Sequence, residues 1–182
     1  MRRAIAKTMT EEEYLAFEET SEVRHEYIHG KLYEMPGTTD FHNLICGNIY
    51  ILLRLLLKKT NFKIFTESIK LRISDKKYTY PDVFITNDDR DSESRQIKRY
   101  PTLIVEVLSD STRVYDKTDK FIMYQQIPTF QYYLTVEPEK PLVECYALQK
   151  DGTWEVETFT QLSETIKLAN LDIELPMTAI YE

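Results

Sequence analysis

Cysteine is scarce in this sequence. Only Cys46 and Cys145 occur among 182 residues, and neither belongs to a C-x-x-C pair. This scarcity argues against a disulfide scaffold and a structural zinc site, and it favours a reducing compartment. We expect both thiols to lie in the core.

Long hydrophobic runs are also missing. The longest, residues 49–57, is interrupted by Arg54 and is far shorter than the roughly 20 apolar residues that span a bilayer. The first ten residues contain no apolar segment of the length that a signal peptide needs. We therefore expect a soluble, cytoplasmic protein.

An excess of basic residues is absent too. The formal net charge is −7 and the isoelectric point is about 5.1, whereas binding to the phosphate backbone usually requires a basic surface. A local stripe can still oppose the total charge. The candidate stripe, which could also be the solvated faces of a helix end and a hairpin, consists of Lys58, Lys59, Lys63, Lys70, Arg72, Lys76 and Lys77.

The segment T-L-I-V-E-V-L-S, residues 102–109, places a glutamate within an aliphatic run. Alternation along a β-strand would put the odd-numbered residues on one face and Glu106 with its even-numbered neighbours on the other. Because both faces are apolar, the run predicts a strand covered on both sides. A buried carboxylate is costly unless it is paired, protonated, near water or bound to a cation, so Glu106 is a candidate functional residue.

Helical and strand patterns alternate along the rest of the chain. Thr10 and Glu13 form a capping-box pattern that opens a short helix. A hairpin around Gly30 follows and ends at Pro36 and Gly37.

A longer core helix comes next, with Asp40 as its expected cap. Its apolar positions recur at helical spacing, at Ile45, Ile49, Leu52, Leu53 and Leu56. Strand patterns then follow at residues 62–73, 80–85 and 102–109. A helical pattern at residues 114–126 ends before Pro128, and another strand pattern follows at residues 130–136. Three more strand-like pieces close the chain. This order predicts one α/β domain over residues 1–182, with a mixed sheet covered by helices.

Asp82 lies at the start of the apolar strand that precedes the Glu106 strand. Because consecutive strands are usually neighbours, the two carboxylates could face each other. Their repulsion would be relieved by a hard divalent cation such as Mg²⁺, which takes one or two carboxylates together with water and phosphate oxygens. The alternative for Asp82 is a structural role in a turn after Pro81.

Six blocks of sequence occur in the order of a known family. They are H-E-Y-I-H-G, M-P-G-T-T-D-F-H-N, Y-P-D-V, L-I-V-E-V-L-S-D-S-T, D-K-T-D-K-F-I-M-Y and Q-Y-Y-L. Through them the chain resembles the Uma-two family of restriction-endonuclease-like proteins, within the PD-(D/E)xK nuclease superfamily. The resemblance implies a core of a helix, three strands, a helix and a strand. To this core the chain would add an N-terminal helix and hairpin and C-terminal strands.

The resemblance also implies a metal-dependent nuclease that acts on DNA, with Asp82 and Glu106 holding Mg²⁺ or, in its place, Mn²⁺. The superfamily lysine should stand two residues after Glu106, where this chain has Leu108. Lys120, on the following helix, matches it instead, and its ammonium would stabilise charge at the phosphate or orient the attacking water. We expect Lys120 at the rim of the site, where its removal would have little effect on stability.

Asp116 and Tyr124 are supporting candidates, because they flank Lys120 at i−4 and i+4 on one helix face. Asp116 and Lys120 could equally be an ordinary surface ion pair. Glu26 and His42 also match the family. A lone histidine in a first helical turn, however, could simply cap or pack.

The first hairpin departs from the family, which usually has Asp-Gly where this chain has His29 and Gly30. A nuclease that cuts both strands commonly uses two symmetric sites, so we expect a homodimer. The alternative function is a non-catalytic nucleic-acid-binding or protein-interaction domain that keeps the fold. The acidic net charge and Leu108 favour this alternative, whereas the intact acidic pair and lysine favour the enzyme.

Overall fold

The computed structural model describes residues 4–35 and 37–182, so the expected hairpin end at Pro36 lies outside the described residues. The central sheet consists of β4 (Lys63–Thr66), β7 (Val83–Thr86), β9 (Leu103–Val107), β10 (Tyr132–Val136), β11 (Val143–Leu148) and β12 (Trp154–Phe159). The second sheet consists of β1 (Ala4–Thr8), β2 (His25–Ile28), β3 (Lys31–Glu34), β5 (Lys70–Ser74), β6 (Lys77–Thr79) and β8 (Ile97–Lys98). A separate hairpin pairs β13 (Thr165–Leu168) with β14 (Ile173–Pro176).

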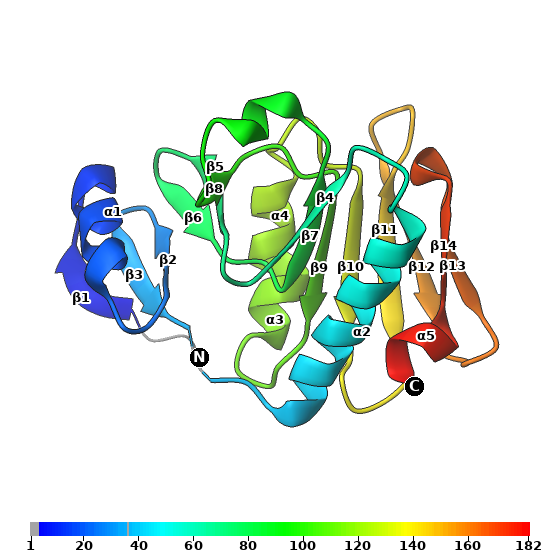
Figure 1. The fold of residues 1–182 in the computed structure, drawn as a ribbon. Helices are drawn as coiled ribbons and strands as arrows, with labels where there is room; N and C mark the ends of the chain where they lie inside the picture. Colours follow the sequence, from blue (N-terminus) through cyan, green and yellow to red (C-terminus); the bar gives the residue numbers. More distant parts are fainter. Residues whose placement is uncertain (1–3, 36) are drawn as a thin grey trace.

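The helices lie between and around these sheets (Figure 1). They are α1 (Glu11–Thr20), α2 (Asp40–Leu56), α3 (Arg113–Tyr115), α4 (Phe121–Tyr124) and α5 (Met177–Tyr181). A π-helical segment, Asp116–Lys120, joins α3 to α4. Within the described ranges, no helix has both the length and the apolar character needed to cross a bilayer.

The central sheet is mixed and is covered on both faces. Strands β9 and β10 pair in parallel, whereas the other neighbouring strands are antiparallel. Helix α2, helix α5 and the β13–β14 hairpin pack on one face, and α4 packs on the other. Strand β9 is buried along its whole length, which confirms the prediction made from its aliphatic run.

The predicted core order is confirmed, because α2, β4, β7, β9, the α3–α4 segment and β10 follow one another as a helix, three strands, a helix and a strand. The sequence patterns did not separate β5, β6 and β8, which leave the central sheet and complete the second one. Strand β8 lies between the strand patterns at residues 80–85 and 102–109, where the sequence predicted no strand. The buried carboxylate of Asp91 fixes this segment by accepting from Thr86 and from the backbone of Arg99 and Tyr100.

Helix α2 differs from expectation at both ends. Thr39, rather than Asp40, is the N-cap, and its hydroxyl accepts from the backbone of His42. Leu56 is 40% exposed, and Leu57 occupies the buried place at the C-terminal end instead. The reason is geometric, because Leu57 continues the i, i+4 row that runs through Leu53.

The second sheet holds the N-terminal hairpin against the core. The capping box at Thr10 and Glu13 is present, and α1 buries Tyr14 against Tyr27 in a stacked pair with ring centroids 4.8 Å apart. The two-residue turn at His29 and Gly30 has positive φ at both positions, as a tight hairpin turn requires. This packing fixes β2, which carries Glu26.

Leu53 should be an anchor of the core. Its side chain is 0% exposed, whereas Leu55 on the same helix is 68% exposed. Leu53→Ala should lower the free energy of unfolding by about 2 to 5 kcal/mol because it leaves a cavity. Leu55→Ala, the matched control, should change it by about 0.5 kcal/mol or less. Denaturant titration measures both values, and equal effects would contradict the placement of α2.

Candidate active site

Asp82 and Glu106 come from neighbouring strands. Strands β7 and β9 are antiparallel with Val83 opposite Val105, so the acidic residues stand at the next positions of the two strands. Both side chains line one cavity of about 80 Å³. Burial raises the pKa of Glu106 well above its ordinary value, and the charge of Asp82 contributes to the same shift. The Asp82 carboxylate also accepts from the backbone N–H of Val107, the residue after Glu106, so the two acids lie side by side.

Lys120 projects from the π-helical segment into a group of acids. Its Nζ lies 2.8 Å from Glu106 Oε1, and it lies 3.3 Å from both Glu26 Oε1 and Asp116 Oδ1. Burial by itself would lower the pKa of Lys120, but the surrounding carboxylates, led by Glu106, raise it well above its ordinary value. Lys120 is therefore held in its charged form.

The expected position of Lys120 at the rim is wrong, because the residue is only 5% exposed. Asp116 is buried as well, so an ordinary surface ion pair is also excluded. The carboxylate of Asp116 has one buried oxygen, Oδ1, without a hydrogen bond among the described residues, although Lys120 lies near it. Burial raises the pKa of Asp116.

Tyr124, at the end of α4, holds the carboxylate of Glu106. Its hydroxyl donates to Glu106 Oε1 at 2.7 Å and lies 3.2 Å from the hydroxyl of Thr79. Tyr115, one residue before Asp116, donates to Glu26 Oε2 at 3.3 Å. The predicted helix face therefore does bring Asp116, Lys120 and Tyr124 to one place, through a local π turn that the sequence did not indicate.

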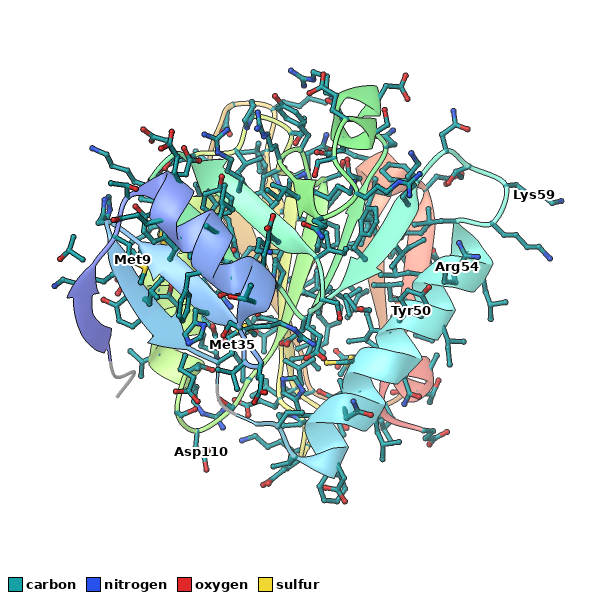
Figure 2. All side chains as sticks on the ribbon, turned by 60° about the vertical axis from the view of Figure 1, so that its left-hand side comes forward. Met9, Met35, Tyr50, Arg54, Lys59 and Asp110 are labelled. Atoms are coloured by element: carbon teal, nitrogen blue, oxygen red, sulfur yellow. The ribbon has the colours of Figure 1, made fainter. Side chains whose placement is uncertain are left out.

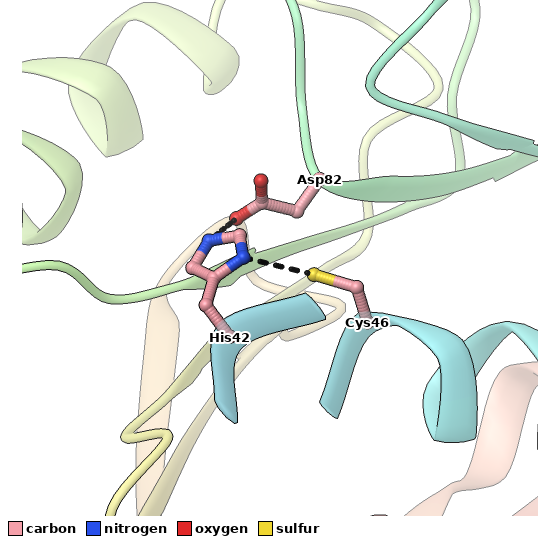
Figure 3. A group of neighbouring side chains, drawn as sticks. All are labelled: His42, Cys46 and Asp82. Carbon is pink, nitrogen blue, oxygen red and sulfur yellow. Dashed lines mark hydrogen bonds and ion pairs between the residues drawn. The ribbon is translucent and has the colours of Figure 1, made fainter. Parts of the chain in front are cut away.

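Asp82 is held by two other groups. Its Oδ2 accepts from the backbone N–H of Val107 at 2.7 Å, and it lies 3.4 Å from His42 Nε2 (Figure 3). Burial lowers the pKa of His42, but the hydrogen bond and charge of Asp82 outweigh burial and raise it overall. His42 thus contacts the site with its side chain, while Thr39 performs the capping.

Cys46 lies one helical turn beyond His42, with its Sγ 3.5 Å from His42 Nδ1. The expectation of two core thiols holds for Cys145, which lies on β11 of the central sheet and is buried in the core. Cys46 is only half-buried, and its sulfur faces the imidazole. Burial raises the pKa of Cys46, so it is present as the neutral thiol.

Two carboxylate oxygens remain for a ligand. Among the described residues, every hydrogen bond and ion pair to Asp82 falls on Oδ2, and every one to Glu106 falls on Oε1. Oδ1 of Asp82 and Oε2 of Glu106 are the oxygens that a cation in the cavity would use. Oxygen donors of this kind suit Mg²⁺ and Mn²⁺.

The sequence reasoning missed several residues that line the cavity. Glu67 lies in the turn between β4 and β5, and Met35 lies beyond the end of β3, between the second sheet and α2 in Figure 2. Tyr115 was overlooked although it directly precedes Asp116. Glu67 could not be found from the sequence, because an acid in a turn has no local pattern that marks it. Tyr115 could have been found from its position next to Asp116.

Comparisons with known proteins identify the family of the chain. The Uma2 family model, described as "Putative restriction endonuclease", matches residues 11–178. The chain belongs to the Uma2 family.

Two similar proteins come from Synechocystis sp. The uncharacterized protein slr1290 is 34% identical over 174 residues, which cover 95% of this chain and 91% of that protein. The uncharacterized protein sll1609 is 33% identical over 154 residues, which cover 83% and 87%. A crystal structure from Anabaena variabilis, described as a "putative nuclease belonging to DUF820", has a TM-score of 0.78 at 18% identity and covers 95% of this chain and 97% of that one. This last likeness confirms the α/β fold of the Uma2 chain.

The burial of Lys120 reverses the expectation for its removal. Lys120→Met keeps the volume but leaves three buried carboxylates without their cation, so it should reduce stability by about 3 to 5 kcal/mol at neutral pH. The deficit should shrink on acidification, because protonation removes the carboxylate charges. Lys117→Met is the matched control. Its partly exposed pair with Glu144 should contribute about 1 kcal/mol or less. Equal denaturation midpoints for the two variants would show that the Lys120 cluster does not support the fold.

Proposed function

We propose that the protein is a Mg²⁺-dependent endonuclease that hydrolyses phosphodiester bonds in DNA. One observation carries the proposal. Asp82 and Glu106 each keep one oxygen clear of the protein contacts described above, and both line a cavity beside the charged ammonium of Lys120. Membership of the Uma2 family supports the same reaction class.

The donor set fits a hard divalent cation. Asp82 and Glu106 supply carboxylate oxygens, and their mutual repulsion is the conflict that a cation relieves. A bound Mg²⁺ would polarise the phosphoryl oxygen and lower the pKa of a coordinated water. Mn²⁺ should substitute, because it accepts the same ligands.

The protein residues position these groups. Tyr124 and Lys120 both contact Oε1 of Glu106, so the carboxylate is held with its other oxygen toward the cavity. His42 and the backbone of Val107 do the same for Asp82. Such preorganisation avoids a reorganisation cost at the moment of reaction.

Lys120 would act on the substrate phosphate. Its ammonium is kept charged by its neighbours, and it lies beside Glu106 in the same cavity. A cation at this position stabilises negative charge that develops on the phosphoryl oxygens. Glu26 and Asp116 would hold the ammonium in place without touching the substrate.

The cavity is too small for a nucleotide. At about 80 Å³ it has room for a cation and several waters, because a site for one water needs roughly 10 to 15 Å³ on this measure. The phosphodiester would therefore approach from outside the cavity, whose lining includes the hydroxyl groups of Thr38, Ser109 and Thr112.

Charge favours the alternative function, a domain that binds nucleic acid or protein without cleavage. The net charge is −7, and the cations of the predicted basic stripe are spread over the end of α2 and strands of both sheets. Arg72, one of them, pairs with Glu11 at 2.8 Å. A wild-type protein that binds DNA but leaves it intact with Mg²⁺ would establish this alternative.

Asp82→Asn and Glu106→Gln should each reduce Mg²⁺-dependent cleavage of plasmid DNA by at least about 10²-fold, because each removes a charged oxygen from the cation site. Circular dichroism should show that both variants remain folded. Glu155→Gln, an exposed carboxylate on β12, is the control and should cleave normally. Chelation with EDTA should abolish wild-type cleavage. Full activity in either site variant would rule out this cation site.

Tyr124→Phe should slow cleavage by about 10 to 100-fold, with little change in KM, because Glu106 loses the hydrogen bond that orients it. Tyr146→Phe is the matched control. It removes a comparable hydroxyl bond of 2.9 Å to Glu144, outside the cavity. Steady-state kinetics on a fluorogenic oligonucleotide separates kcat from KM. If the two variants behave alike, Tyr124 supports packing and not the position of Glu106.

A further inference from the structure

Helix α2 is apolar on its outer side as well as its inner side. Its inner row, Ile45, Ile49 and Leu53, is buried in the core. Of the eleven exposed large hydrophobic side chains in the described part of the chain, five lie on this helix, namely Phe41, Leu44, Ile51, Leu55 and Leu56. Exposed apolar patches mark interaction surfaces.

The outer residues have the spacing of a helix–helix seam. Phe41, Leu44, Asn48, Ile51 and Leu55 follow one another at intervals of three and four residues. This is the heptad pattern with which one helix packs along another. Four of the five side chains are between 55% and 68% exposed, whereas Asn48 donates to the backbone carbonyl of Ile180 on α5. The single chain therefore leaves the four apolar side chains of the seam largely uncovered.

Gly47 lies in the middle of the same outer side. A side chain at this position would meet nothing within 4 Å in the single chain, although glycine weakens a helix interior relative to alanine. The fold of one chain therefore gives no reason for this glycine. Close approach of a second helix does, because the missing Cβ lets two backbones come together.

The charges on the outer side favour an antiparallel pair. Asp40 is exposed at the N-terminal end of α2, and Arg54, Lys58 and Lys59 are exposed at or beyond its C-terminal end. Figure 2 shows Arg54 and Lys59 directed away from the body of the protein. A parallel pair would place each Arg54 beside its own copy, whereas an antiparallel pair places it beside Asp40 of the other copy.

We infer that a second copy of this chain docks on α2, with the two α2 helices antiparallel about a two-fold axis beside Gly47. In this register Leu44 packs against Ile51 of the second copy, and Asp40 pairs with Arg54 of the second copy. Such an isologous contact is self-complementary and closes as a dimer. This inference does not depend on the proposed nuclease activity.

The seam is small for a permanent dimer. A standard interface buries about 800 Å² on each partner, and one helix face supplies only the centre of such an area. We therefore expect a reversible dimer with a dissociation constant in the micromolar range. Sedimentation equilibrium of the full-length chain measures it without any substrate or metal.

The first test removes the seam. Leu44→Gln with Ile51→Gln should weaken dimerisation by at least tenfold, as should Gly47→Leu, whose new side chain has open space in the single chain. Unfolding curves should show that these variants stay folded. Val156→Gln is the control, because Val156 is comparably exposed on β12, and its dimerisation should be unchanged. A wild-type chain that is monomeric at 100-fold above micromolar concentration overturns the inference.

The second test fixes the register. Asp40→Arg alone and Arg54→Asp alone should each weaken the dimer, because each places like charges together. The double variant should restore dimerisation to near the wild-type value, since the pair is re-formed with its charges exchanged. Within one chain these positions lie at opposite ends of α2, so only contact between copies explains a rescue. Additive losses without rescue overturn the antiparallel register.

Discussion

The architecture of the site depends on one buried ammonium. Lys120 lies within 3.3 Å of carboxylates from β2, β9 and its own helix, and so it links the second sheet, the central sheet and the layer between them. Three acids share one cation here, and burial of a charge is tolerated only when it is paired. The same contact therefore holds the two sheets together and keeps a cluster of carboxylates from repelling itself apart.

Asp82 adds a further carboxylate to the cavity beside the three that share Lys120. The negative charge there is therefore not balanced by the one ammonium. Tyr124 contacts one oxygen of Glu106 and the His42 imidazole contacts one oxygen of Asp82, which leaves the other oxygen of each carboxylate to the cavity. Orientation by neighbouring groups thus comes from both faces of the central sheet. Strand β9 makes this possible because it is buried on both sides. Residues on the strand and at its end therefore contact the helices on both faces of the sheet.

The sequence predicted what is encoded locally. The aliphatic run identified β9, the capping box identified α1, and consecutive strands placed Asp82 beside Glu106. The burial of Lys120 was not predictable, because a long polar side chain normally reaches solvent. Its contact with Glu26 joins residues far apart in the chain and is set by the packing of two sheets. The π turn at Asp116–Lys120 likewise has no periodic signal in the sequence.

The long-range contact between Glu26 and Lys120 has a consequence for biosynthesis. Glu26 leaves the ribosome well before Lys120, so an incomplete chain has the first acid but neither the lysine nor its helix. Non-local contacts of this kind form late, after the chain entropy of closing the loop has been overcome. The cavity is therefore assembled only when both sheets have docked. Nascent or partly unfolded molecules lack an ordered site, and any hydrolytic capacity is confined to the completely folded population.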